Sequence, residues 1–573
     1  PARELRYRLT LHLAAAGRSS EYLEMYRHHY QSLGIDRLDC LAVNAEILAG
    51  RAQEIVSLAE KLWLVGRSQV EECDPVFDYL RGAGLLDESM LEQRFELAVS
   101  AKQLSLARYL ARSMDDRFLH QASQWIEARD DAEPFLQSEL QQIGEENDLD
   151  IHRDQLLFAI EQVSYGDAGL ASEYWRGIRS RHEFSPQQMA HISRHIALSA
   201  AQQHRPDAYP LLTDLAADAT DAKVRSWRAR AALREHAWEK AIVAIDAMPA
   251  EERQAEEWQY WLAVALQQTG ADTEARSVLE TLAAERSYYG FLAADAVDAD
   301  YAYANAMTPE EESIIDELAQ NPSLIRAREL FYVGLESRGR SEWDDVVNEL
   351  DDGARTQAAV LAHRWNWHSR AIATVATVGQ YDDLEIRYPL PYYDQFAEYS
   401  ATAKIPGSWA YGVARSESLF MTDIRSHAGA IGLMQLMPDT GRRTASDLDL
   451  PYAGVKTLTD PASNIRLGTA YLGKMLERFG DNVVLATAAY NAGPFKVEEW
   501  LPESQRLDAR IWIENIPYDE TRDFVRRVLF SDAIFHWRLT GETRRVSAAL
   551  RAVGPSATPE RLSRVEKKSD PDS

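Results

Sequence analysis

The sequence has few cysteines and no evident metal-binding pattern. Its 573 residues include two cysteines, Cys40 and Cys73, with no histidine–cysteine cluster near them at the spacing of a metal site. Two buried free thiols would be ordinary in a cytosolic protein, whereas an oxidising compartment would favour a disulfide between neighbouring helices. We predict no metal ion and no cofactor.

The chain also has a shortage of basic charge and no long apolar run. Acidic residues outnumber basic residues by 90 to 62, so the formal net charge is −28 and the pI is about 5.0. This charge opposes binding to nucleic acid phosphates, and we expect no nucleic acid partner. No run reaches eighteen apolar residues, so we expect no transmembrane segment. No signal peptide is visible at Pro1 to Glu4, and the start without methionine fits a chain whose signal peptide has been removed.

The first three hundred or so residues predict an array of helices. They are rich in Ala, Leu, Glu, Gln and Arg with helical periodicity. One apolar pattern recurs after thirty-four residues, the spacing of a tetratricopeptide-like hairpin, first as Ala237, Ala241 and Ile245 and then as Ala271, Ala275 and Leu279. Because this echo is clear for one step only, we predict an irregular α-superhelix of helical hairpins.

Composition shifts divide the chain into four predicted parts. A chain of this length, 46% hydrophobic, is too long for one core. Residues 1–307 form the superhelical domain and residues 308–387 a small helical linker domain. Pro389 and Pro391 break any helix and mark the start of a third domain, 388–540. The polar segment 541–573 is predicted to be a flexible tail.

Glu417 is the residue most suited to catalysis. On a helix it shares a face with Val413 and Trp409, one and two turns earlier, and such an apolar face can keep a carboxylic acid protonated near neutral pH. Ser408 is a candidate N-cap for this helix. A lone glutamate on an amphipathic helix is usually a solvated surface residue, so the neighbouring motifs decide the interpretation.

Three further motifs follow Glu417. Ser426 precedes a glycine-led turn at 432–435, in which Gln435 is a polar amide among apolar residues and needs hydrogen-bond partners that a sugar could supply. Met437 would either contact a groove or fill the core. Tyr490 and Asn491 close another helix with groups suited to binding a sugar, and segment 516–522 carries Glu520.

Together the motifs at 417–418, 432–435, 489–491 and 516–522 resemble the soluble lytic transglycosylases, which cleave peptidoglycan. The resemblance implies a mainly α fold in which a U-shaped superhelix and a linker domain precede a lysozyme-like catalytic domain. It implies Glu417 as the catalytic residue, with Ser426 near the substrate acetamido group or near Glu417. Tyr490 and Asn491 would hold the saccharide, Tyr490 would also orient Glu417, and Glu520 would support the site.

Glycosidic bond cleavage ordinarily takes two carboxyl groups, and the second is not evident. Asp423 and Asp439 lie beside turn signals where Asp is commonly solvated, and Glu514 is a weaker candidate than Glu520. The resemblance implies that Glu417 acts twice, first as acid and then as base, so that the sugar's own O6 closes a 1,6-anhydro ring without water. A hydrolytic muramidase and a non-catalytic peptidoglycan-binding scaffold are the alternatives.

The resemblance also implies a periplasmic location, which favours a disulfide between Cys40 and Cys73 over free thiols. The implied partners are peptidoglycan glycan strands, with cell-wall synthesis proteins as a further candidate class.

Overall fold

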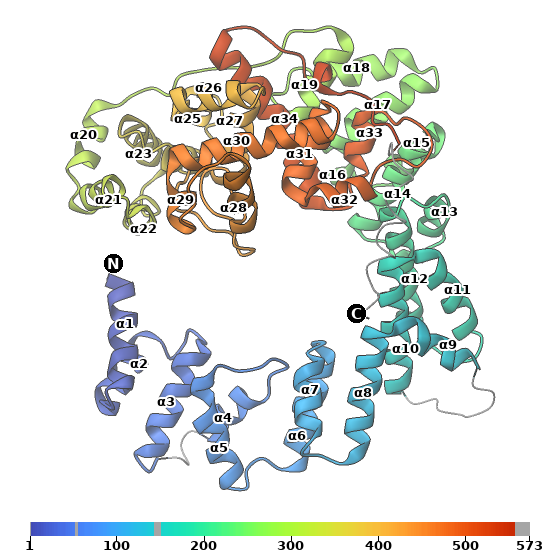
Figure 1. The fold of residues 1–573 in the computed structure, drawn as a ribbon, viewed down its shortest axis with the longest axis vertical. Coiled ribbons are helices and arrows are strands. Elements are labelled where there is room, and N and C mark those ends of the chain that lie inside the picture. Colours follow the sequence, from blue (N-terminus) through green and yellow to red (C-terminus); the bar gives the residue numbers. More distant parts are fainter. Residues whose placement is uncertain (1, 52–55, 142–149, 556–573) are drawn as a thin grey trace. The chain divides into compact units, whose positions relative to one another are not determined.

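The computed structural model describes residues 2–51, 56–141 and 150–555 (Figure 1). The described residues fall into two compact units, the first ending at Ser199 and the second beginning at Ala200. Extended pairing within the described residues is limited to isolated bridges, Arg425–Ile431, Ile431–Leu436 and Leu507–Val553. The predicted mainly α fold is therefore confirmed. None of the described helices is long and apolar enough to cross a bilayer.

The first unit is a succession of short helices (Figure 1). Their bounds are α1 Ala2–Ala15, α2 Ser19–His29, α3 Asp36–Leu48, α4 Val56–Trp63, η2 Glu71–Cys73, α5 Asp74–Gly82, α6 Glu88–Ser100, α7 Leu104–Ala111, α8 Asp116–Asp130, α9 Ala132–Gln141, α10 Asp150–Gly166 and α11 Ala168–Ile178, with α12 Pro186–Gln202 crossing the boundary between the units.

The second unit begins with further hairpins. These helices are α13 Ala208–Thr213, η3 Ala217–Ala219, α14 Ala222–Arg234, α15 Trp238–Asp246, α16 Ala250–Arg253, α17 Glu256–Gln268, α18 Asp272–Leu282 and α19 Tyr288–Val297. The predicted linker range holds α20 Glu312–Gln320, α21 Pro322–Tyr332, α22 Glu336–Val347, α23 Asp352–Arg364, α24 His368–Thr377 and α25 Leu384–Arg387. The predicted catalytic range follows with α26 Tyr393–Thr402, α27 Gly407–Ser418, α28 Pro438–Asp447, α29 Val455–Thr459, α30 Pro461–Arg478, α31 Val483–Ala492, α32 Pro494–Glu499, α33 Ala509–Glu514 and α34 Asp519–Thr540, and η4 Val546–Ala549 lies beyond it.

Many hairpins share one turn. A residue with positive φ lies two positions after the end of the first helix, and the N–H of the next residue donates to the carbonyl five residues earlier, which is the longer bond of the Schellman motif. Such positive-φ residues include Gly17, Lys102, His236, Gly270, Gly334 and Asn366. The echo in the sequence marks two copies of this turn, because Ala237 and Ala271 directly follow it and cap α15 and α18.

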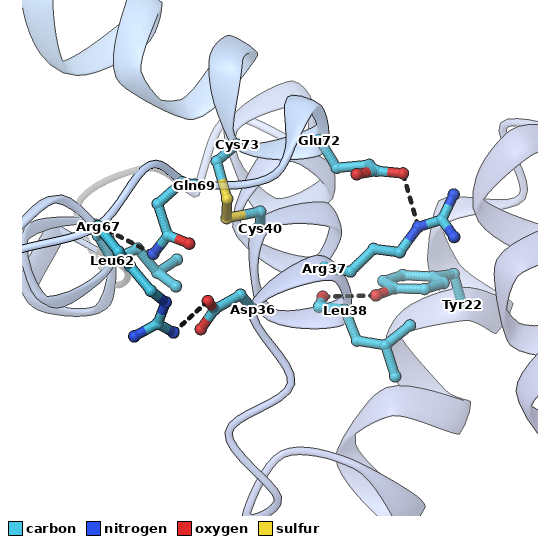
Figure 2. The surroundings of a disulfide bond; sticks show 10 residues. All are labelled: Tyr22, Asp36, Arg37, Leu38, Cys40, Leu62, Arg67, Gln69, Glu72 and Cys73. Carbon is cyan, nitrogen blue, oxygen red and sulfur yellow. Dashed lines mark hydrogen bonds and ion pairs between the residues drawn. A yellow bond between two sulfur atoms is a disulfide. The ribbon is translucent and has the colours of Figure 1, made fainter. Parts of the chain in front are cut away.

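A disulfide joins Cys40 of α3 to Cys73 at the end of η2 (Figure 2). The two Cα atoms are 4.9 Å apart, within the usual range for a disulfide. An ion pair between Arg37 and Glu72 connects the same two segments, with 2.6 Å between Nε and Oε1 (Figure 2). The first unit is thus held between α3 and the start of α5 by a covalent bond and a neighbouring ion pair.

The predicted flexible tail is wrong over its first part. Residues 541–555 are packed, since Val546 and Val553 are buried and Leu507 exchanges backbone hydrogen bonds with Val553. The Val546 N–H donates to the Tyr301 hydroxyl at 2.7 Å. Apolar residues within a polar segment anchor it, an effect that average composition conceals. Residues 556–573 of the predicted tail lie outside the described residues.

A buried ionic cluster connects α33 and α34 with the preceding hairpins. Glu514 accepts hydrogen bonds from Tyr289 of α19 and from Arg526 of α34. Glu257 of α17 pairs with Arg526 and with Arg230 of α14, at 3.3 and 2.6 Å. The catalytic range is therefore fixed to the hairpins that precede it through paired charges, and Glu514 has a structural place in that contact.

Candidate active site

Glu417 lies in the last turn of α27, a helix that is buried along most of its length. Trp409 and Val413 have no exposed surface, as the sequence predicts for the face they share with Glu417. Close packing against α34 requires Gly412, because a Cβ there would lie 3.0 Å from the Val528 carbonyl oxygen. The helix ends abruptly at Leu419, whose φ is +50°.

The predicted N-cap of α27 is wrong. The helix begins at Gly407, and Pro406 with its extended ψ of 130° stands at the capping position, so Ser408 is already inside the first turn. Ser408 is buried, and its Oγ accepts a hydrogen bond from Arg544 Nη2 at 3.1 Å. Pro406 restricts the backbone at the start of α27, and the helix begins without a side-chain cap. The Ser408 hydroxyl instead binds the segment after α34.

The surroundings of Glu417 favour its neutral form. Burial is the main cause, and the negative charge of Glu520 adds to it, so that the pKa of Glu417 is raised to about 8, while Arg527 acts in the opposite direction. Across the described residues no side chain or backbone group forms a hydrogen bond or ion pair with the Glu417 carboxyl. The acid therefore holds its proton at neutral pH and keeps it available for a ligand.

The loop between α27 and α28 folds back on itself through residues predicted to bind sugar. Ser426 Oγ accepts from the Ala430 N–H at 2.9 Å. Gln435 Nε2 donates to the carbonyl oxygens of Ile424 and Gly432 at 3.2 and 2.9 Å. The polar amide thus finds its partners inside the loop. We define residues 424–437 as the site loop.

Three side chains from other helices fasten the site loop. Ser418 Oγ, at the end of α27, donates to the Leu433 carbonyl at 2.7 Å. Asn464 of α30 accepts from the Met434 N–H at 2.8 Å, and the Tyr490 hydroxyl of α31 donates to the Met434 carbonyl at 2.7 Å. Both backbone groups of one residue are therefore bound by buried side chains, which fixes the loop tightly.

Some hydrogen-bonding capacity remains on the predicted residues. In the part of the chain that the structure describes, the Ser426 hydroxyl hydrogen, Gln435 Oε1 and Asn491 Nδ2 have no partner. Asn491 Oδ1 accepts from Thr521 Oγ1 at 2.6 Å, which connects α31 with α34. These residues combine a structural bond with a free donor or acceptor.

The remaining predicted residues differ in how closely they relate to Glu417. Tyr490 is buried, and burial first and the charge of Glu417 second raise its pKa well above the usual range. Glu520 is exposed in the first turn of α34 and acts on Glu417 through its charge. Met437 is 43% exposed at the start of α28, so its interpretation as core filler is wrong. No interaction within the described residues joins Ser426 or Met437 to Glu417.

Sequence reasoning missed a contact between the predicted linker range and the two residues that directly precede the site loop. Asp423, interpreted above as a solvated turn residue, accepts from Arg340 Nη1 at 2.7 Å and from the Ser337 N–H at 2.8 Å. Glu336 is buried, and its carboxylate also lies 3.3 Å from Arg340 Nη1 and accepts from Thr422 Oγ1 at 3.3 Å. We name these residues the linker contact. The two segments that form the linker contact lie far apart in sequence, and neither carries a motif from which the contact could be predicted.

Asp439 keeps its predicted place on the surface. Its carboxylate is 73% exposed and pairs with Arg442 three residues later. Within the described residues no group of three or more His, Cys, Asp or Glu side chains is arranged to hold a metal ion. Glu417 thus lies within electrostatic reach of Tyr490 in α31 and Glu520 in α34, and its neighbour Ser418 binds the site loop.

Comparison with known proteins gives one family over almost the whole chain. The family model described as the transglycosylase SLT domain matches residues 394–513, and the model of the soluble lytic murein transglycosylase L domain matches residues 317–384. The soluble lytic murein transglycosylase of Escherichia coli K12 is 30% identical over 561 residues, covering 94% of this chain and 82% of that protein.

Solved structures give the same result. A lytic transglycosylase from Pseudomonas aeruginosa, solved as an inactive mutant, matches with a TM-score of 0.77 at 31% identity, covering 95% of this chain and 87% of that one. A 70-kDa soluble lytic transglycosylase in complex with bulgecin A matches with a TM-score of 0.79 at 27% identity, covering 96% and 89%. The predicted superhelical fold is confirmed by these matches.

Proposed function

The chain belongs to the soluble lytic murein transglycosylase family, and from this premise we propose that it cleaves the β-1,4 bond between N-acetylmuramic acid and N-acetylglucosamine without water. The products are glycan chains with 1,6-anhydromuramyl ends. One observation supports this reaction above the others: Glu417 is an acid whose pKa is raised to about 8 and whose carboxyl no described residue binds.

In the first step Glu417 is the general acid. It donates its proton to the glycosidic oxygen as the bond from carbon 1 of N-acetylmuramic acid to that oxygen breaks, and N-acetylglucosamine leaves with a free O4 hydroxyl. The substrate acetamido group stabilises the positive charge at carbon 1, which removes the need for a second carboxylate. A pKa near the working pH suits an acid that must be protonated before the step and ionised after it.

In the second step the Glu417 carboxylate is the general base. It takes the proton of the O6 hydroxyl as O6 bonds to carbon 1, which closes the anhydro ring and restores the neutral acid. No water is consumed, and no second protein acid is required. A carboxylate in an apolar surrounding is a stronger base than one in water, so the same burial serves both steps.

We assign the free hydrogen-bonding groups of the site to the sugar. The Ser426 hydroxyl would donate to the acetamido group, Gln435 Oε1 would accept from a sugar hydroxyl, and Asn491 Nδ2 would donate to the saccharide. Each assignment is supported by the observation that the atom concerned has no hydrogen-bond partner within the described residues. Tyr490 would hold the site loop and Glu417 in place. Met437 would offer its exposed side chain to a sugar face.

Glu520 is proposed to support the site through its charge on Glu417. Its negative charge strengthens the retention of the Glu417 proton, which is the state that the first step needs. A hydrolytic muramidase would instead require a base that activates water, and analysis of the product ends distinguishes that reaction from the proposed one.

We further propose a periplasmic location, where peptidoglycan lies and where the disulfide would persist. Glycan strands are the proposed partner, and cell-wall synthesis proteins stay a prediction. The division into residues 1–307, 308–387 and 388–540 is likewise a proposal. It is supported by the two family models, which match 317–384 and 394–513 within the linker and catalytic ranges.

Mass spectrometry of the muropeptides released from purified sacculi tests this function. We expect 1,6-anhydromuramyl ends, which lack one water relative to the reducing ends that a muramidase produces. Folded Glu417→Gln protein should release neither. Products with only reducing ends would contradict the proposed reaction, and intact sacculi bound but never cleaved by the wild-type protein would support a scaffold.

A further inference from the structure

The first unit contains a cavity of about 500 Å³ that the proposed reaction does not use. The end of α4, the segment before η2, and helices α5, α6 and α7 form its walls. Three aromatic side chains, Trp63, Phe77 and Tyr109, line it together with Arg94 and Gln69. Tyr109 is 62% exposed, whereas Trp63 and Phe77 are buried. We name this space the Arg94 cavity.

Arg94 is a buried cation that no carboxylate of the described residues pairs with. Its side chain is 4% exposed, and its guanidinium carbon lies 4.0 Å from the centre of the Trp63 ring and 5.1 Å from that of Phe77. Nothing in the described ranges accepts a hydrogen bond from it, and its Nε is enclosed without a partner. Burial lowers the pKa of Arg94 to about 10, so the group is still charged at neutral pH.

Other buried arginines of the chain are arranged differently. Arg526 and Arg230 are paired with Glu514 and Glu257 in the cluster described above. An unpaired buried charge is less stable than a paired one, because a paired charge regains part of the interaction that it loses with water. A cation kept in this state beside an open cavity is typical of a site whose anion is supplied by a ligand.

Gln69 adds an unused acceptor to the same cavity. Its Nε2 donates to the Leu62 carbonyl at 2.9 Å, which fixes the direction of the amide (Figure 2). Its Oε1 is buried and has no donor in the part of the chain that the structure describes. The Arg94 cavity is therefore complementary to a ligand that carries both an anionic group and an N–H donor.

We propose that the Arg94 cavity binds the carboxyl-terminal end of a short peptide. The carboxylate pairs with the Arg94 guanidinium, whose carbon lies 4.0 Å from the centre of the Trp63 ring and whose N–H groups can form a bidentate bond with a carboxylate. An amide N–H of the peptide donates to Gln69 Oε1, and its side chain lies against Phe77 and Tyr109. If the proposed function holds, the source is the peptide portion of peptidoglycan, so that the first unit binds the strand by its peptides at a distance in sequence from Glu417.

The charges around the cavity favour a carboxylate over a more highly charged anion. Asp74, Asp78 and Arg81 also line it, and Arg81 pairs with Asp78 at 2.7 Å. Asp74 has no ion pair within the described residues, and its negative charge repels a doubly charged phosphate more strongly than a singly charged peptide end. The aromatic lining provides apolar contact that an inorganic ion would not use.

The test is a saturation-transfer NMR titration of the full-length protein with acetyl-D-alanyl-D-alanine and with its carboxyl-terminal amide. We expect the acid to bind at least ~10-fold more tightly than the amide, the ratio for about 1.4 kcal/mol. Arg94→Met keeps the packing of the side-chain stem and should weaken binding of the acid at least ~10-fold. Arg112→Gln, an exposed arginine of the same hairpin outside the cavity, should bind as the wild type does.

Tyr109→Ala is a second test in case the Arg94 variant misfolds, because the Tyr109 side chain is largely exposed and its removal should leave the fold intact. It should weaken both probes by ~3-fold or more with unchanged thermal unfolding. Equal binding of acid and amide, unchanged binding by Arg94→Met, or inorganic phosphate that competes as well as the acid would each overturn the proposal. Release of anhydro ends from short glycan chains should be the same for Arg94→Met and wild type, so failure here leaves the proposed reaction untouched.

Discussion

Two glycines with nearly the same backbone conformation stand in opposite surroundings. Gly270 lies just after α17 in the hairpin array with a φ of +87°, and a Cβ there would meet no atom of the described residues within 4 Å. Gly432 in the site loop has a φ of +84°, and a Cβ there would lie 2.1 Å from the Leu458 carbonyl oxygen. The hairpin array is shaped by local turns, whereas the site loop is shaped by segments that close around it.

The same contrast applies to polar groups. In the hairpins the chain satisfies its helix ends with its own backbone, through the recurring bond to the carbonyl five residues earlier. In the site loop, Ser418, Asn464 and Tyr490 reach in from three helices to bind the backbone of two residues. A turn that depends on its own backbone tolerates substitution. We expect the site loop, which depends on side chains from three helices, to be sensitive to it.

Removal of the titrating proton should have the largest effect. We expect Glu417→Gln to lower the rate of cleavage by at least ~10² to 10⁴, the usual contribution of a positioned general acid or base. Because the amide keeps the shape of the acid, the fold should persist. Release of muropeptides from sacculi, measured beside circular dichroism, checks both parts. A folded variant with near wild-type turnover would remove Glu417 from the reaction.

The fold could be predicted further than the contacts of the site. Helical periodicity and one repeated apolar pattern were enough for the superhelix, because hairpins depend on neighbours in sequence. The motifs identified Glu417, Ser426, Gln435, Tyr490 and Asn491 as a group. They did not reveal that several of these bind the site loop itself, because a side chain's partner depends on packing between distant segments.

The errors have the same origin. Ser408 has the residue type of an N-cap, yet the chain enters α27 through Pro406, and Ser408 binds Arg544 from beyond α34. Residues 541–555 look like a polar tail, yet Val546 and Val553 are buried. Asp423 looks solvated, yet Arg340 and the Ser337 N–H bind it. In each case a partner far away in sequence overrides a local preference.

Alanine at Gly270 and at Gly432 tests the contrast between the hairpin array and the site loop. Gly270→Ala should cost about 1 to 2 kcal/mol of unfolding free energy, since only the positive φ is strained. Gly432→Ala adds overlap with a backbone carbonyl, which contributes about 1 to 3 kcal/mol more, and should also abolish most activity. Denaturant unfolding and turnover check both variants. Equal destabilisation would mean that the site loop yields as easily as a hairpin turn.

Removal of the disulfide tests the hairpin array at a covalent bond. The bond between Cys40 and Cys73 spans a sequence separation of 33 and should contribute roughly 3 to 4 kcal/mol to stability. The double alanine variant should unfold earlier while it still cleaves short glycan chains at the wild-type rate. Thiol labelling of the denatured, unreduced wild-type protein should find no free thiol, and two reactive thiols would contradict the bond in solution.

The pH dependence of stability tests the site through Glu417. The pKa of this group is raised in the folded protein from an ordinary value near 4.5 to about 8, so the folded state holds the proton more tightly than the unfolded state. Its contribution is full below about pH 4.5 and is lost as pH rises through about 8. The melting temperature of the wild type relative to Glu417→Gln should therefore fall across this window. Cleavage should fall above about pH 8, because the acid is then ionised. A constant difference in melting temperature would mean that Glu417 titrates as it does in water.

The smallest effect is expected at the linker contact, which joins α22 to the residues directly before the site loop. Arg340 binds Asp423, which directly precedes Ile424, and the Ile424 carbonyl accepts from Gln435. Arg340→Gln should therefore loosen the loop and lower kcat/KM by ~2- to 30-fold, the range of 0.5 to 2 kcal/mol for coupling between separate segments.

Arg326→Gln is the matched control, because Arg326 of α21 pairs at 3.0 Å with Glu342 of α22, the helix that carries Arg340, and within the described residues it forms no bond with the site loop or with Asp423. It should change kcat/KM by less than ~2-fold. Steady-state cleavage of short glycan chains by both variants gives the comparison, and their thermal unfolding shows whether the helix pair is intact. An equal decrease of kcat/KM in Arg340→Gln and Arg326→Gln would mean that the hydrogen bonds of Ser418, Asn464 and Tyr490 are enough to fix the site loop. The linker contact would then only join two parts of the chain.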